Sequence, residues 1–145
     1  MADFHSPEDL QAAGRALAAS LPDFAILVLV GELGAGKTTF AQGLAAGLGV
    51  ASELEVASPT YTLIHEYHRP GVSFYHLDLY RVETTQQFAT LGLEDLFVPP
   101  PPGSKKVIAI EWGERLESYL PKPYLRLEFF APTPTFRHLQ VIANR

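Results

Sequence analysis

FAILVLVGELGAGKTTF, at residues 24–40, is the stretch that decides the fold of this 145-residue chain. Apolar residues fill positions 24–30, a glycine-rich segment follows, and residues that favour a helix come next. The segment 31–38, GELGAGKT, matches the pattern G-x-x-x-x-G-K-[ST] of a phosphate-binding loop, with the buried strand before it and the helix after it that the mechanism requires. Successive backbone N–H groups and the helix N-terminus then point at one spot, so we expect a polyphosphate to bind there.

The residue types of this loop suit a nucleotide with a metal ion. Glycine lets the backbone adopt conformations that a Cβ would obstruct, so the chain can approach the phosphates closely. Lys37 would place a point charge between the β- and γ-phosphates, the Thr38 hydroxyl would be a Mg²⁺ ligand, and Thr39 is placed to help at the α-phosphate. The alternative is a glycine-rich turn with an incidental surface lysine. The expected nucleotide-binding residues of the loop are Gly31, Glu32, Leu33, Gly34, Ala35, Gly36, Lys37, Thr38 and Thr39.

The bulk composition is that of a globular protein with a single domain over residues 1–145. Apolar residues make up 47% of the chain and charged residues 19%. The absence of cysteine excludes disulfides, thiolate metal sites and thiol catalysis, and it fits a cytoplasmic location. The N-terminal segment lacks the features of a signal peptide, and the apolar runs are too short to span a bilayer. A net charge of −5 argues against direct binding of nucleic acid, so a link to RNA would pass through a partner.

Helices are predicted on both sides of the first strand. Before it, a helix capped at Ser6 is expected, with apolar residues at helical spacing up to Leu21. After the phosphate loop, a helix is expected over residues 38–48, with an apolar stripe along one face and with Gly47 and Gly49 as stop signals.

The rest of the chain is predicted to form mainly strands. Pairs of segments rich in β-branched and aromatic residues predict two β-hairpins, one at 60–81 and one at 124–145. Residues 106–112, KVIAIEW, predict a second buried strand that a helix (113–120) follows, and one or two short helices are expected within 84–97. The predicted fold is an α/β, P-loop NTPase-like sandwich in which helices flank a mixed central sheet, with β-hairpin additions.

Two acidic residues are candidates to complete a nucleotide site. Such a site needs a carboxylate at the end of a neighbouring strand, to hold the metal's waters or to orient an attacking water. Glu111 ends the apolar run VIAI and fits the form of four apolar residues followed by an acid, whereas Asp78 lies between leucines in the first hairpin. The alternatives are a solvent-facing strand end for Glu111, and a surface charge or an ion pair with Arg81 for Asp78.

Other positions carry less specific signals. Thr60 could reach the metal or the γ-phosphate and sense which nucleotide is bound, or it could serve only turn chemistry. Trp112 could stack near the base, although a lone tryptophan is more often part of a core. His65 and His76 could face each other across the hairpin, but no third ligand completes a metal spacing, which favours a structural role for both.

Five motifs in a fixed order resemble a known family. GELGAGKTT, SPTYTLIHEY, FYHLDLYR, GLEDLF and IEWGERL, between about Val30 and Leu116, closely resemble the bacterial tRNA threonylcarbamoyladenosine biosynthesis ATPases, the TsaE (YjeE) family. The resemblance implies a small ATPase that binds ATP and Mg²⁺ and works with the TsaD–TsaB pair. That pair transfers a threonylcarbamoyl group to N6 of adenosine 37 in tRNA, so this chain would meet tRNA only indirectly.

The resemblance also implies roles for individual residues. Lys37 and Thr38 would bind phosphate and Mg²⁺, and Thr60 would lie in a switch-like segment. Asp78 and Glu111 would lie beside the metal and the attacking water. The expected catalytic residues are therefore Lys37, Asp78 and Glu111, and the expected metal ligands are Thr38, Asp78 and Glu111. Which of the two acids binds the metal directly stays open.

The expected activity is ATP hydrolysis that is slow without partners, because the sequence shows no clear arginine finger. One alternative is a small P-loop kinase, although the seven arginines do not cluster as a kinase lid usually requires. Another is a nucleotide-gated interaction module in which hydrolysis is incidental.

Overall fold

The computed structural model describes residues 2–32, 36–51, 64–79, 93–112, 114–134 and 136–144. Within them, the α-helices are α1 (Pro7–Ser20) and α2 (Lys37–Leu48), and the 3₁₀ helices are η1 (Leu93–Phe97) and η2 (Glu114–Tyr119). The strands are β1 (Ala2–Phe4), β2 (Phe24–Val30), β3 (Ile64–Arg69), β4 (Val72–Asp78), β5 (Lys105–Glu111), β6 (Tyr124–Thr133) and β7 (Phe136–Asn144).

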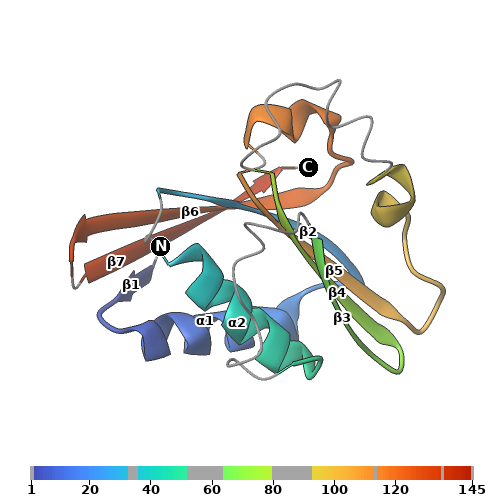
Figure 1. The fold of residues 1–145 in the computed structure, drawn as a ribbon, viewed down its shortest axis with the longest axis horizontal. Helices are drawn as coiled ribbons and strands as arrows, with labels where there is room; N and C mark the ends of the chain where they lie inside the picture. Colours follow the sequence, from blue (N-terminus) through green and yellow to red (C-terminus); the bar gives the residue numbers. More distant parts are fainter. Residues whose placement is uncertain are drawn as a thin grey trace.

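The strands form one seven-stranded sheet in the order β1-β7-β6-β2-β5-β4-β3. The four central strands β6, β2, β5 and β4 run parallel, and β3, β7 and β1 are antiparallel to their neighbours. Figure 1 shows α1 and α2 together on one face of this sheet. The predicted α/β sandwich, with a mixed central sheet and hairpin additions, is therefore confirmed.

Strand β2 is the centre of the fold because both of its faces are covered. On one face, Leu27 belongs to the same buried cluster as Phe40 of α2. On the other face, Val28 packs in a second cluster with Ile108 of β5 and with Leu120, which follows η2. A parallel strand covered on both faces needs a continuous apolar run, and this is the pattern from which the strand was predicted.

Glycines let α1 and α2 approach each other closely. A Cβ built on Gly14 would lie 2.4 Å from the carbonyl oxygen of Phe40, and a Cβ on Gly43 would lie 2.1 Å from the carbonyl oxygen of Gln11. Real Cβ atoms do not come this close to backbone, so both positions need glycine for the helices to pack as they do.

The helix α2 ends at the second of its two predicted stop signals. The prediction for Gly47 was wrong: the helix continues through it, and a Cβ there would lie 2.8 Å from the Cβ of Ala18, so its smallness serves the packing of the helices. Gly49 is the C-cap, with a φ of 73° that glycine adopts without strain.

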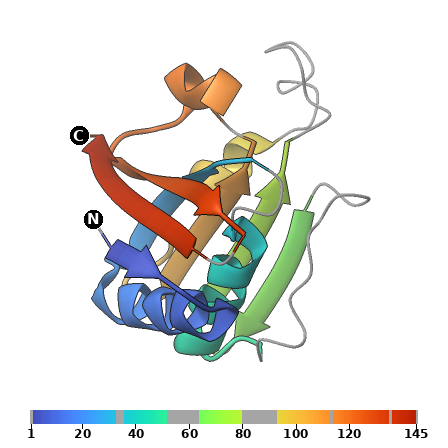
Figure 2. The same ribbon diagram turned by 90° about the vertical axis from the view of Figure 1, so that its left-hand side faces the viewer.

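The N-terminal segment adds an edge strand that was not predicted. Strand β1 has only three residues, too few for a readable alternation, and it forms by pairing with β7, where Phe4 lies opposite Arg137. Figure 2 shows β1 beside β7 at the edge of the sheet. The predicted cap of α1 is confirmed, since the Ser6 hydroxyl accepts a hydrogen bond from the N–H of Asp9 at 3.2 Å.

Both predicted hairpins are present. In the first, β3 and β4 pair so that His65 lies opposite His76, as predicted. In the second, the strands reach further into the turn than predicted, since Thr133 already pairs with Phe136.

The strand β5 and the segment after it differ in detail from the prediction. The strand ends at Glu111, because Trp112 has a φ of 62° that a strand cannot continue. The helix expected over 113–120 is a shorter 3₁₀ helix, η2, and only the end of the segment 84–97 is described, as η1. No helix in the described part of the chain has both the length and the apolar character needed to cross a bilayer.

Candidate functional site

The carboxyl ends of β2, β5 and β4 lie side by side at one edge of the sheet. Leu29 on β2 is opposite Glu111 on β5, and Glu111 is opposite Asp78 on β4. The glycine-rich segment leaves the end of β2, and α2 begins at Lys37. The fold thus brings the predicted loop and both predicted acids to the edge at which open α/β sheets bind their ligands.

Gly36 determines how α2 begins. Its φ of 106° is in the region that favours glycine, and a Cβ built on it would lie 2.6 Å from Cδ1 of Leu10. In the described part of the chain no side chain caps this helix. The first N–H groups of a helix have no partner within it, so an anion suits this end. Leu33, Gly34 and Ala35 lie outside the described residues.

The side chain of Lys37 is buried along the loop. Only 4% of the residue is exposed, and its Nζ donates a hydrogen bond to the carbonyl oxygen of Gly31 at 2.6 Å. The same Nζ lies 3.8 Å from the ring centroid of Trp112. The structure therefore places the indole against the ammonium group, where it can hold the cation by its π face.

Glu111 is buried and contacts two side chains, those of Thr38 and His76. It is 3% exposed, so the alternative of a solvent-facing strand end is excluded. Its Oε2 accepts a long hydrogen bond from the Thr38 hydroxyl at 3.4 Å and lies 2.5 Å from Nε2 of His76. One carboxylate oxygen thus connects β5, α2 and β4.

His76, to which the sequence analysis assigned only a structural role, lies against the predicted acid Glu111. It is fully buried, its Nε2 faces Glu111, and its Nδ1 has no hydrogen-bond partner among the described residues. Its ring stacks on Phe74 at 6.3 Å with an interplanar angle of 16°. The available signal was its spacing: His76 precedes Asp78 by two residues, and alternate residues of a strand point to the same face.

The oxygen donors at this edge suit Mg²⁺. Asp78 is 4% exposed, so the alternative of a surface charge is excluded, and Arg81 lies outside the described residues. Two buried carboxylates opposite each other in the register are costly unless cations or donors meet them. No three His, Cys, Asp or Glu side chains among the described residues form a metal-binding group, but Mg²⁺ needs only one or two carboxylates with phosphate and water. Thr38, Asp78 and Glu111 offer that chemistry.

The structure describes some, but not all, of the remaining residues that were predicted to bind the nucleotide. Glu32 is exposed beyond the end of β2, and Thr39 is half-buried in the first turn of α2. Thr60 lies outside the described residues. Its role as a nucleotide sensor stays a prediction.

The strand, loop and helix, with acids at the ends of the neighbouring strands, define an α/β protein of the P-loop NTPase-like class. The sequence model of one family, described as threonylcarbamoyl adenosine biosynthesis protein TsaE, matches residues 4–138. The chain belongs to this family.

Individual relatives agree with this assignment. The chain is 38% identical over 122 residues to the tRNA threonylcarbamoyladenosine biosynthesis protein TsaE of Bacillus subtilis, a match that covers 84% of this chain and 72% of that protein. It is 41% identical over 116 residues to the protein of the same name from a Nostoc species, covering 79% and 67% of the two chains. The crystal structure of Bacillus subtilis YdiB is similar with a TM-score of 0.74 at 30% identity, over 98% of this chain and 83% of that one.

Proposed function

We propose that this chain binds ATP with Mg²⁺ and hydrolyses it in support of threonylcarbamoylation of adenosine 37 in tRNA, acting with the TsaD–TsaB pair. Membership of the TsaE family and the names of the relatives support the place in tRNA modification. The resemblance of the ordered motifs supports ATP as the nucleotide and TsaD–TsaB as the partners. Contact with tRNA would be indirect, in keeping with the net charge of −5.

The observation that carries the proposal is the meeting of Thr38 and Glu111. The hydroxyl that a phosphate loop uses for Mg²⁺ lies 3.4 Å from a buried carboxylate on the neighbouring strand. Lys37 is on the same turn of α2, and Asp78 is opposite Glu111 in the sheet. Loop, lysine, hydroxyl and two acids are the parts that phosphoryl transfer from ATP to water requires.

Each residue then has a defined task. The loop N–H groups and Lys37 would stabilise the charge that develops on the β- and γ-phosphates. Mg²⁺, when bound, would supply positive charge that offsets the charge on the phosphates. Thr38 and one of the two acids would hold the ion, and the other acid would accept a hydrogen bond from the attacking water. Trp112 would contribute by holding Lys37, and Thr60 would respond to the γ-phosphate.

The replacement Glu111→Gln tests the proposal, because it keeps the shape of the side chain and removes its charge. We expect the variant to hydrolyse ATP about 100-fold more slowly than the wild type or worse, the magnitude typical of losing one aligned electrostatic group. Phosphate release in the presence of TsaD–TsaB is the measurement. The matched control is Glu66→Gln, an exposed glutamate on β3, which should leave the rate unchanged.

The same experiment separates the alternatives. A kinase would place the phosphate on a small molecule instead of releasing it. If the chain were a nucleotide-gated module, the Glu111→Gln variant would bind ATP without hydrolysing it and would still support full tRNA modification. If Glu111→Gln hydrolysed ATP at the wild-type rate, the proposed role of Glu111 in hydrolysis would be wrong.

A further inference from the structure

We propose that the cavity at the first residues of β4 and β5 binds a phosphate group carried by a small molecule. The cavity has a volume of about 250 Å³ and lies beside the β3–β4 turn and the proline segment 99–101. In Figure 1 this turn and the segment that leads into β5 lie at the same end of the sheet, at the lower right. The cationic and hydroxyl side chains among its lining residues are those of Arg69, Ser73, Ser104, Lys105 and Lys106.

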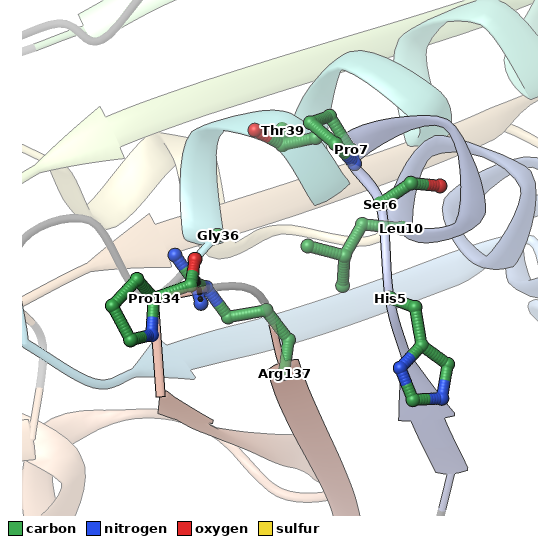
Figure 3. Close-up of a pocket in the computed structure, with 8 residues that line it drawn as sticks. All are labelled: His5, Ser6, Pro7, Leu10, Gly36, Thr39, Pro134 and Arg137. Carbon is green, nitrogen blue, oxygen red and sulfur yellow. Dashed lines mark hydrogen bonds between the residues drawn. The ribbon is translucent and has the colours of Figure 1, made fainter. Parts of the chain in front are cut away.

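This cavity is separate from the candidate nucleotide site. Asp78 and Glu111 are the last residues of β4 and β5, whereas the cavity lies at the first residues of the same two strands. Figure 3 shows a different cavity, beside the start of α2, where Gly36 forms part of the wall. The two cavities share no lining residue in the described part of the chain, so a ligand in one does not occupy the other.

Strand pairing brings cations from both faces of the sheet to this end. Arg69 lies opposite Val72, and Val72 lies opposite Lys105, so Arg69 and Lys105 are on the same face. Lys106 lies opposite Ser73 and is on the other face, because successive residues of a strand point to opposite faces. The two faces meet where the strands begin, and all three cations therefore line one cavity.

Backbone carbonyl oxygens hold the three cations in place. The Nε of Arg69 donates to the carbonyl oxygen of Leu48 at 2.7 Å, and each lysine Nζ donates to two carbonyl oxygens at distances between 2.8 and 3.3 Å. Among the described residues, none of the three forms an ion pair with a carboxylate. Acidic side chains of that part of the chain therefore do not balance these charges directly, although the whole chain has a net charge of −5.

Capping of helix ends explains part of this arrangement. Arg69 and Lys105 donate to carbonyl oxygens at the C-terminal ends of α2 and α1, where a cation is favourable. Lys106 donates instead to carbonyl oxygens at the end of η1, and the hydroxyls of Ser73 and Ser104 line the same cavity. A third cation and two hydroxyls add donors that the two α-helix ends do not need and that an anion would use.

A phosphate group matches these donors better than a carboxylate does. A phosphate monoester carries about −1.5 to −2 charges at pH 7 and three strong acceptor oxygens. A carboxylate has a single charge and two oxygens, which would leave most of the donors unused. The guanidinium group of Arg69 suits phosphate because its N–H groups form a planar fork. The proline segment 99–101 supplies a wall against which the rest of a small molecule would lie.

A nucleic acid suits this surface less well. Proteins that bind a phosphate backbone present basic side chains along a stripe or a whole face. Here the cations converge on one cavity of about 250 Å³, in a chain with a net charge of −5. The ligand is therefore a molecule with one phosphate group rather than a nucleic acid strand.

Titration of inorganic phosphate into the ¹⁵N-labelled protein tests the proposal, with ionic strength held constant by sodium chloride. We expect saturable changes in the amide chemical shifts of Gly71, Ser104, Lys105 and Lys106. Phosphate bound at the phosphate loop is recognised separately, by shifts at Gly36, and those changes should disappear when a non-hydrolysable Mg-ATP analogue is bound there. The shifts at the cavity should remain, because the two places share no lining residue.

Variants assign the contacts. We expect Lys106→Gln to raise the Kd for phosphate at the cavity about tenfold, because a charge-assisted hydrogen bond is lost. Ser104→Ala should raise it by a smaller factor, and Arg69→Gln with Lys106→Gln in one chain by a larger one. The matched control is Lys122→Gln, which removes the same charge from an exposed position outside the cavity and should keep the Kd within about twofold. Thermal unfolding checks each variant, and should the double variant not fold, the single variants decide.

The choice of ligand identifies the chemical class. Glycerol 3-phosphate should shift the same amides and bind at least as tightly as inorganic phosphate, and acetate should bind at least about tenfold more weakly. The proposal is wrong if the shifts at the cavity do not saturate, if acetate binds as well as phosphate, or if Lys122→Gln weakens binding as much as Lys106→Gln. Shifts at these amides with tRNA but not with either small phosphate would assign the cations to a nucleic acid and would also overturn it.

Discussion

At the scale of single residues, the Oε2 atom of Glu111 links the parts of the candidate site. Thr38 of α2 and His76 of β4 both contact it, at 3.4 Å and 2.5 Å. The sequence predicted Thr38 and Glu111 from their types and spacing, since a phosphate loop and an acid after an apolar run have a known relation. It favoured a structural role for His76 and did not predict its contact with Glu111, because a histidine in a strand is informative only once its neighbour across the sheet is known.

Replacement of His76 tests this link. We expect His76→Ala to lower the free energy of unfolding by about 1–3 kcal/mol, because a buried carboxylate oxygen loses its short contact with the imidazole and keeps only the long hydrogen bond from Thr38. We also expect it to reduce kcat for ATP, with KM changed less, because Glu111 loses its orientation. Chemical denaturation and steady-state kinetics measure the two effects.

The conservative variant His76→Gln separates the effect of His76 on the orientation of Glu111 from its effect on the stability of the whole protein. Its amide N–H can face Glu111, so kcat should recover more than the free energy of unfolding does. If His76→Ala unfolds more easily but hydrolyses ATP at the wild-type rate when folded, then the histidine serves stability alone.

At the scale of elements, the close contact between α1 and α2 holds the phosphate-loop helix in place. Gly14 and Gly43 remove the side chains that would separate the two backbones. The apolar stripes predicted both helices, but the sequence alone could not say which glycines end a helix and which pack. Gly47 shows this limit: a glycine near a helix end reads as a stop signal until the neighbouring helix is seen.

The replacement Gly43→Ala tests the helix contact. Alanine favours an isolated helix by about 1 kcal/mol over glycine. Here the new Cβ would lie 2.1 Å from the carbonyl oxygen of Gln11. Because this oxygen is a backbone atom, it cannot rotate away as a side chain could. We therefore expect a net loss of about 1–3 kcal/mol in the free energy of unfolding, measured with urea.

A control on the same helix is Ala46→Ser, at a half-buried position, which should change the free energy of unfolding by less than about 0.5 kcal/mol. A Gly43→Ala protein more stable than wild type would mean that the helices do not pack as closely as the structure shows.

At the scale of the whole molecule, the sheet order assembles a site from distant segments. The loop after β2, Asp78 of β4 and Glu111 of β5 are far apart in the chain, and the order β2-β5-β4 brings them to one edge of the sheet. The sequence predicted the α/β class because strand and helix patterns alternate. It could not predict the order of the strands, because that order depends on which distant segments pair.

The most direct test of the central proposal is repeated tRNA modification in a reconstituted system. The chain is combined with TsaD, TsaB, the threonylcarbamoyl donor, ATP and excess unmodified tRNA, and modified adenosine is counted per TsaD–TsaB complex. We expect many rounds with wild type and with the control Lys122→Ala, an exposed lysine far along the chain from the loop. With Lys37→Ala we expect at most about one round, because phosphate binding and charge stabilisation are lost. Equal numbers of rounds with wild type and Lys37→Ala would contradict the proposed role of ATP in this protein.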